Sequence, residues 1–278
     1  MRRKSAYVLA EKASEIQLNE ALEANFVGYV AKIFANTSLP CKKPIKNTFC
    51  RQNGGLKVYL CAPDDIGLPY GAFPRLLLSE IVTQVRLTGS QDVFLGRSVS
   101  DLLRRMGKKS SGGKNGSLTT YRQQTQRLLS TSFNVIFESE HRFEIDNFNV
   151  AGQASMLWEP SESSSSGLRI SISDEFYEDI LISSFPVDKR VLYALSNYPL
   201  AIDVYCWLTY RFSFLRSPTF VSWLQLKEQF GSDISTMSNF KRKFSRAIYR
   251  VSILYPAGQC YPEDRGVKLY PSPTHIPR

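Results

Sequence analysis

This chain of 278 residues contains few residues whose types and spacing would suit catalysis or metal binding. The two histidines, His141 and His275, match neither H-E-x-x-H nor the paired-histidine metal motif of a DNA-nicking enzyme. Cys41, Cys50 and Cys61 are separated by eight and ten residues, without the C-x-x-C knuckle of a zinc site, which favours buried free thiols. We therefore expect no catalytic centre, no metal and no cofactor, and the protein is predicted not to be an enzyme.

One glycine-rich segment has the composition of a phosphate-binding loop, GKKSSGGKNGS over residues 107–117. A P-loop requires a preceding strand and a lysine followed by serine or threonine. Here Asn115 follows Lys114, and no strand is expected before Gly107. Nucleotide binding is therefore not predicted at this segment.

Two predicted helices carry the side chains that suit contact with nucleic acid. The first runs from Ser117 to about Thr131 and places amides, hydroxyls and one guanidinium opposite its apolar stripe, with no carboxylate on that face. Such groups can reach base edges and phosphates. The candidate contact residues of this helix are Thr119, Thr120, Gln123, Gln126 and Arg127.

The second helix is predicted over 238–254, where apolar residues recur at helical spacing from Phe240 to Val251. Its basic residues lie on the opposite side, as expected for a helix that binds phosphates, although a solvated surface would show the same pattern. The candidate contact residues are Ser238, Lys241, Arg242, Lys243, Ser245, Arg246 and Tyr249.

Each of these helices is the last helix of a predicted series that ends in strands, the third helix in the first series and the fifth in the second. The first series has helices over 76–86, 98–106 and 117–131, followed by strand-like segments over 133–137, 143–145, 156–158 and 168–173. The second has helices near 174 and 188, then over 201–215, 221–230 and 238–254, followed by a hairpin over 260–262 and 267–270. Three helices followed by a β-ribbon are typical of the winged helix-turn-helix.

The predicted fold class is therefore α+β and mainly helical, with two tandem winged-helix domains that carry β-hairpin wings. We expect the domains to cover 51–173 and 174–278, after an N-terminal part, 1–50, of helix and loops. In that part, apolar residues from Ile16 to Ile33 predict one amphipathic helix over 11–35. This helix would either pack on the body of the protein or serve self-association.

The charge pattern agrees with two modules that bind a polyanion. The net charge is +10 and the isoelectric point is near 9.4, which indicates nucleic acid or an anionic membrane surface as partner. Residues 70–139 hold ten basic and four acidic side chains, 140–187 hold two and nine, and 188–278 hold thirteen and six. No apolar run is long enough for a membrane span, the basic start lacks the apolar core of a signal peptide, and five scattered cysteines favour the cytoplasm.

The sequence also resembles a known family over residues 50–278. The segments that carry the resemblance are GLPYGAFPRLLL (67–78), LTGS (87–90), GGKNGSLTTYRQQTQRLL (112–129), FPVDKRVLYAL (185–195), PLAIDVYCWLTYRFSFL (199–215), SWLQLKEQFG (222–231), FKRKFSRAI (240–248) and PSPTHIPR (271–278). They are similar to the RepA-type plasmid replication initiators. Leu87 departs from that pattern, where a basic residue is expected, and this affects one local contact only.

The resemblance implies an initiator that binds double-stranded DNA at origin repeats, represses its own gene and recruits host replication proteins such as a helicase or host initiator. It places GGKNG and the helix from Ser117 at the first DNA contact, and FKRKFSRAI at the second. Phosphate contacts are then expected from Lys108, Lys109 and Lys114, with Asn115 beside them. A second copy of the chain is a further expected partner, because dimers and monomers separate repression from initiation in such proteins.

Two other functions fit the same residues. A winged-helix transcriptional regulator would use the same DNA contacts to repress a promoter, without any role in initiation. Alternatively, the second winged helix would bind protein, with the acidic block over 138–179 as its docking surface. Directly repeated sites at an origin would favour initiation, one inverted repeat would favour repression, and the absence of a site would favour the protein-binding module.

Overall fold

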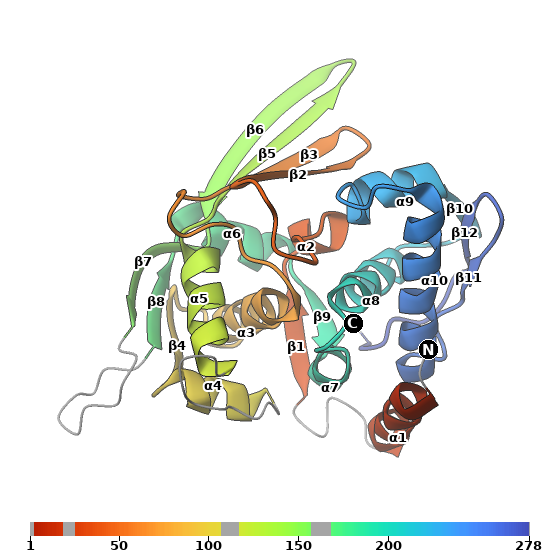
Figure 1. Ribbon diagram of the computed structural model, residues 1–278, viewed down its shortest axis with the longest axis horizontal. Coiled ribbons are helices and arrows are strands. Elements are labelled where there is room, and N and C mark those ends of the chain that lie inside the picture. Colours follow the sequence, from red (N-terminus) through yellow and green to blue (C-terminus); the bar gives the residue numbers. More distant parts are fainter. Residues whose placement is uncertain (1–2, 19–25, 107–116, 157–167, 278) are drawn as a thin grey trace. The chain divides into compact units, whose positions relative to one another are not determined.

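The computed structural model describes residues 3–18, 26–106, 117–156 and 168–277, and its helices and strands divide between two compact units (Figure 1). Unit 1 comprises Met1–Ser38, Arg51–Lys57 and Phe185–Arg278, and unit 2 comprises Leu39–Cys50 and Val58–Ser184. Both helices and strands occur in each unit, as expected for an α+β protein. No helix in the described part of the chain is long and apolar enough to cross a bilayer.

Unit 2 is built around α3 (Ala72–Thr88), which is buried along most of its length. The helix begins after Gly71 and ends at Gly89, whose left-handed backbone (φ 65°) forms a C-cap that favours glycine. Next come β4 (Asp92–Gly96) and α4 (Val99–Arg105). The predicted start of α4 is confirmed, because the Ser98 side chain accepts a hydrogen bond from the backbone N–H of Asp101 at 3.1 Å.

The third helix of unit 2, α5 (Ser117–Leu129), is followed by two hairpins rather than one. The first, β5 (Ser132–Ser139) and β6 (Arg142–Asn149), belongs to a sheet of order β2-β3-β5-β6, with β2 (Thr48–Asn53) and β3 (Leu56–Cys61). The second, β7 (Ala151–Met156) and β8 (Leu168–Ile172), joins β4 in the order β4-β8-β7. Of the strand predicted over 156–158, Met156 belongs to β7, and residues 157–158 lie outside the described residues.

Unit 2 ends with α6 (Asp174–Ser183), which the predicted boundary at 173/174 assigns to the following domain. The ring of Phe176 on α6 stacks on Phe148 at 5.0 Å, and Phe148 stacks on Phe133 at 4.9 Å. Tyr177 donates a hydrogen bond to the backbone oxygen of Gly89 at 2.7 Å. These contacts attach α6 to the core of unit 2, so the division of the chain falls after Ser184.

Unit 1 begins with α1 (Arg3–Leu18), which buries Leu9, Ala13 and Ile16 and contacts α7 (Lys189–Ala194) and α10 (Met237–Leu254). The predicted single helix over 11–35 is wrong. Residues 27–30 form β1 (Val27–Val30), which pairs antiparallel with β9 (Phe185–Asp188), and a short α2 (Ile33–Asn36) follows. A strand partner more than 150 residues away is invisible to local periodicity.

The remainder of unit 1 repeats the order of elements found in unit 2. It runs through α8 (Pro199–Phe212), β10 (Thr219–Ser222), α9 (Trp223–Phe230), α10, β11 (Cys260–Pro262) and β12 (Gly266–Leu269). Its sheet has the order β10-β12-β11, which corresponds to β4-β8-β7. The β5–β6 hairpin of unit 2 is thus an insertion between the third helix and the last two strands.

Candidate nucleic-acid interface

The helix α10 is amphipathic, and its apolar side builds much of the core of unit 1. Phe244 is fully buried and its ring lies 5.4 Å from that of Phe230, 5.4 Å from Phe240, and 6.1 Å from both Trp207 and Trp223. This cluster holds α10 against α8 and α9. The opposite side of the helix is therefore left for solvent or a ligand.

A tight turn joins α9 to α10. A Cβ atom at Gly231 would lie only 2.3 Å from Cδ2 of Phe240, so the close approach of turn and helix requires glycine here. The side chain of Thr236 then caps α10 by accepting a hydrogen bond from the backbone N–H of Asn239 at 3.3 Å. Two helices joined by a short glycine-containing turn are the arrangement of a helix-turn-helix.

A buried arginine holds this turn in place, and the sequence carries no local signal for it. Arg51 lies in the β2–β3 hairpin, in its outer part (Arg51–Lys57), which belongs to unit 1. Its side chain is fully buried. Its guanidinium donates to Ser232 at 2.5 Å, to Asp233 at 2.8 Å and to Ser38 at 3.1 Å. Because Arg51 and Asp233 are 182 residues apart in the chain, only the fold brings them together.

The outer side of α10 brings together most of the residues predicted for the second contact helix. Ser238, Arg242, Arg246 and Tyr249 are exposed, and Lys243 and Ser245 are half-buried. From Ser238 to Tyr249 the stripe is about 16 Å long at 1.5 Å per residue. The helix carries five basic and no acidic residues, which makes this side a strongly positive surface.

Two of the predicted residues of α10 have cationic groups that are engaged within the unit. The guanidinium of Arg242 donates to Oδ1 of Asn239 on the same helix at 2.9 Å, and the ammonium group of Lys241 contacts a more distant part of the chain. Nζ donates to the backbone oxygen of Asp264 at 2.9 Å and lies 5.8 Å from the ring centre of Trp223. Asp264 is in the turn between β11 and β12, so Lys241 ties the helix to that hairpin. Arg250, nearer the end of α10, similarly lies over the ring of Tyr198 at 4.1 Å.

In unit 2, α5 exposes three of the five residues predicted for the first contact helix. Thr120, Gln123 and Gln126 are exposed, and Thr119 is half-buried. Lys108, Lys109, Lys114 and Asn115, which were predicted beside them, lie outside the described residues.

Arg127, the fifth predicted residue of α5, contacts a loop of its own unit. Its guanidinium donates to the backbone oxygen of Leu68 at 3.3 Å and lies 5.3 Å from the ring centre of Tyr70. The neighbouring Gln124 is buried and accepts a hydrogen bond from the backbone N–H of Tyr70 at 2.8 Å. This end of α5 is thus occupied by the loop 67–70.

The comparisons with known proteins agree with this architecture. The family described as "Plasmid encoded RepA protein" matches residues 68–225, more than half of the chain, and takes in parts of both units. The chain therefore belongs to the RepA family of plasmid replication initiators, as its sequence motifs predicted. No curated protein matches it.

Solved structures share the fold at low sequence identity. The crystal structure of selenomethionine derivatives of domain 2 and domain 3 of RctB is 16% identical, with a TM-score of 0.53 over 86% of this chain and 96% of that chain. A second crystal structure of RctB domains 2-3 is also 16% identical, with a TM-score of 0.48 over 86% and 94%. The former likeness shows that one arrangement of elements spans most of both chains.

Proposed function

We propose that this protein starts replication of a plasmid or related mobile element by binding repeated duplex sequences at the origin. Each unit acts as a winged helix, with α10 as the recognition helix of unit 1 and α5 as that of unit 2. Binding at operator-like repeats also lets the protein repress its own gene. The proposal rests on family membership together with the exposed basic side of α10.

The exposed basic side of α10 carries the side chains that are needed to contact bases in a major groove. A recognition helix enters the groove and contacts base edges, while basic residues contact the phosphates. The guanidinium groups of Arg242 and Arg246 can each make two hydrogen bonds to one guanine, whereas Lys243 acts as a point charge toward phosphate. In α5, Gln123 and Gln126 offer amides suited to adenine.

The protein contributes binding energy and deformation of DNA rather than bond chemistry. Two recognition helices in one chain can read successive turns of a duplex, about 10 base pairs apart. Copies on neighbouring repeats would bend the DNA and strain an adjacent A·T-rich segment, which eases its opening. A host helicase or host initiator would then act on the opened strands.

The experiment that tests this proposal compares Arg246→Ala with a matched arginine outside α10. Arg142 is a suitable control, because it is exposed on β6 and pairs with a neighbouring carboxylate, Glu144, on the same strand. Binding is measured by fluorescence anisotropy on a duplex with the element's own repeats and on a scrambled duplex. We expect Arg246→Ala to lose affinity for the repeats and Arg142→Ala to keep it.

A footprint on the origin distinguishes initiation from repression alone. Protected direct repeats, together with loss of plasmid replication in cells that carry the Arg246→Ala variant, would support an initiator. A single protected inverted repeat, with replication unaffected by the variant, would support a transcriptional regulator instead. Wild-type protein that protects no site would contradict both.

A further inference from the structure

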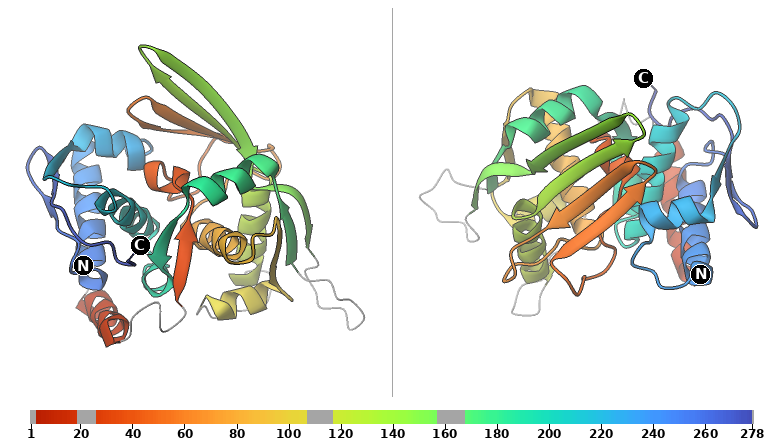
Figure 2. Two further views of the ribbon diagram at one scale, coloured as in Figure 1. Left: turned by 180° about the vertical axis from the view of Figure 1, so that it is seen from behind. Right: turned by 90° about the horizontal axis from the view of Figure 1, so that it is seen from above.

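The outer side of the sheet β10-β12-β11 in unit 1 exposes aromatic rings around a lysine. Strand side chains alternate between the two sides of a sheet. Val267 and Leu269 point inward and are fully buried, whereas Phe220 and Tyr261 on the outer side are 47% and 53% exposed. No described element of unit 1 covers this side (Figure 1 and Figure 2). We infer that it binds single-stranded nucleic acid, whose unpaired bases stack on Phe220 and Tyr261.

The strand register places the two rings on either side of one cation. Lys268 on the central strand β12 is the direct partner of Phe220 on β10 and of Tyr261 on β11. Since neighbouring strands are about 4.8 Å apart, the two aromatic positions are separated by roughly 10 Å. That separation equals about three base steps of 3.4 Å, so both rings can serve one strand while Lys268 meets the phosphates between them.

Two further residues shape this surface. The ring of Tyr270 meets that of Tyr261 edge-on at 5.9 Å, and Nζ of Lys268 lies 5.4 Å from the ring centre of Tyr270. A Cβ atom at Gly266 would lie 2.7 Å from Cζ of Phe220 and 2.2 Å from the backbone oxygen of Val221. Glycine at this position therefore lets the ring of Phe220 lie along the sheet, where a flat side remains open to solvent.

The charges favour a nucleic acid over a protein as the occupant. The outward positions of the described strands carry Lys268 and no carboxylate, and exposed Arg216 precedes β10. Glu263 and Asp264 lie in the hairpin turn, at the end of the sheet away from Tyr270. Protein interfaces are enriched in aromatic residues but depleted in lysine, whereas aromatic rings with cations are the usual platform for unpaired bases. A sheet with exposed aromatics is also how RNA-recognition domains stack bases.

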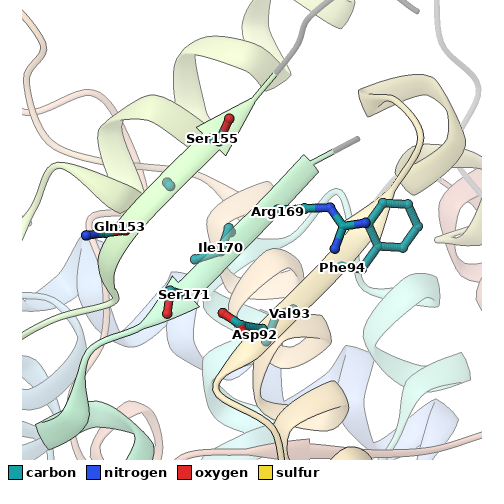
Figure 3. A pocket seen from close by; sticks show the side chains of 9 residues that line it. Asp92, Val93, Phe94, Gln153, Ser155, Arg169, Ile170 and Ser171 are labelled. Carbon is teal, nitrogen blue, oxygen red and sulfur yellow. The ribbon is translucent and has the colours of Figure 1, made fainter. Parts of the chain in front are cut away.

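The corresponding sheet of unit 2 provides a natural control. Its matching row is Phe94, Arg169 and Ser155. The guanidinium of Arg169 lies over the ring of Phe94 at 5.3 Å (Figure 3), and Ser155 stands where unit 1 has Tyr261, so this row offers one ring, 41% exposed, instead of two. The hollow beside it is lined by apolar and polar residues, and the polar ones include a carboxylate, Asp92. We therefore expect no base stacking on unit 2.

The test measures binding of the full chain to a fluorescently labelled 20-nucleotide oligo(dT) by anisotropy. Phe220→Leu and Tyr261→Leu keep an apolar side chain but remove the ring, and each is expected to weaken binding roughly 5- to 150-fold, the range for loss of one stacked base. Phe220→Trp should retain binding. Lys268→Ala should flatten the salt dependence by about 0.7 in the slope of log K against log salt. Phe94→Leu, the matched control, should bind as the wild type does.

The same variants are measured on the duplex with origin repeats, because the inference does not depend on duplex binding by α10. Retained duplex affinity with lost oligo(dT) affinity supports a separate single-strand site, whereas parallel loss of both overturns it. The inference is also overturned if the wild type does not bind oligo(dT) at low salt, or if a variant that combines Phe220→Leu with Tyr261→Leu binds it as well as the wild type. Unchanged thermal unfolding of Phe220→Leu shows that the loss is one of binding.

Discussion

Unit 1 and unit 2 follow the same order of elements, but they present different side chains on the third helix and on the outer side of the sheet. In unit 1, α10 exposes arginines and the sheet exposes Phe220 and Tyr261. In unit 2, α5 exposes amides and hydroxyls, and the outer side of the sheet has one partly exposed ring, Phe94, beside Arg169 and Ser155. Inward positions must fill a core, so they are constrained in both units, whereas outward positions are free to differ. A shared topology therefore does not imply a shared ligand.

The inserted β5–β6 hairpin is a further difference between unit 2 and unit 1. The β5–β6 hairpin is inserted in the chain between α5 and β7, so the pairing of β4, β8 and β7 is left intact. Its edge strand β6 exposes Phe143 and Ile145, with Glu144 and Asp146 between and beside them. The added hairpin thus contributes acidic side chains to unit 2, whose helix α6 carries further carboxylates at Asp174, Glu175, Glu178 and Asp179.

The largest expected effect concerns the aromatic core that supports α10. Phe244→Ala should lower the free energy of unfolding by about 3–5 kcal/mol, because a fully buried ring is replaced by a cavity. Phe143→Ala in the inserted hairpin should change it by less than about 0.5 kcal/mol, since that ring is 64% exposed. Urea unfolding of both variants measures the difference. Equal losses would mean that the hairpin is as tightly packed as the core.

The second largest effect is expected from replacing Arg51, the buried arginine of unit 1. Arg51→Ala should lower the free energy of unfolding by about 1–3 kcal/mol, because the hydrogen bonds to Ser232, Asp233 and Ser38 are lost. It should also weaken binding to origin repeats, since the turn before α10 loses its anchor. Arg142→Ala, which breaks a surface ion pair, should change stability by less than about 1 kcal/mol. Unchanged repeat binding by Arg51→Ala would separate the turn from recognition.

A comparison of Arg246 on α10 with Arg127 on α5 tests which of the two helices contacts bases. Arg246→Ala should weaken specific binding by about 1–3 kcal/mol, as expected for an arginine that contacts a base. Arg127→Ala should weaken it less, because its guanidinium already contacts Leu68 and Tyr70. Salt-titrated anisotropy on repeat and scrambled duplexes measures both. The opposite ranking would make α5 the principal recognition helix.

His275 in unit 1 predicts that the stability of the protein depends on pH. His275 stacks on Tyr255 at 4.5 Å, and its Nδ1 shares a hydrogen bond with the hydroxyl of Tyr205 at 3.0 Å. Burial lowers the pKa of His275 below its ordinary value of 6.5, while nearby Asp188 raises it and Arg190 lowers it. The folded state therefore binds this proton less readily than the unfolded chain, and stability should fall as the pH drops below about 6.5.

The variant His275→Phe keeps a flat ring against Tyr255 but cannot be protonated. Between pH 7.5 and pH 5, its unfolding midpoint in urea should depend on pH less than that of the wild type. His141→Phe should follow the wild type, because His141 is exposed in the inserted hairpin. Equal pH dependence in all three proteins would show that His275 does not couple to folding.

The smallest expected effect separates two neighbouring lysines of α10. Lys243→Ala should flatten the salt dependence of duplex binding by about one unit of slope if its ammonium neutralises a phosphate. Lys241→Ala should flatten it less, since Nζ already donates to the backbone oxygen of Asp264. If Lys241→Ala shows the larger change, the lysine must leave Asp264 when DNA binds.

Much of the architecture could be predicted because it is encoded locally. The helices predicted over 76–86, 98–106 and 238–254 correspond to α3, α4 and α10, and the hairpin predicted over 260–262 and 267–270 corresponds to β11 and β12. Family motifs spread over both units predicted the RepA family. In each case the signal lies within one helix turn, one cap, one tight turn or one short motif.

Long-range pairing could be decided only by the tertiary structure. The residues 27–30 continue a helical pattern, yet they form a strand because Phe185–Asp188 offers them a partner. Arg127 and Lys241 appear equivalent to other basic residues in the sequence, but one contacts Leu68 and the other Asp264. The sequence by itself determined most of the helical segments, which side of α10 is apolar and which family the chain joins. Which cations remain exposed to a ligand depends on neighbours distant in the chain, and those are set only when the units fold.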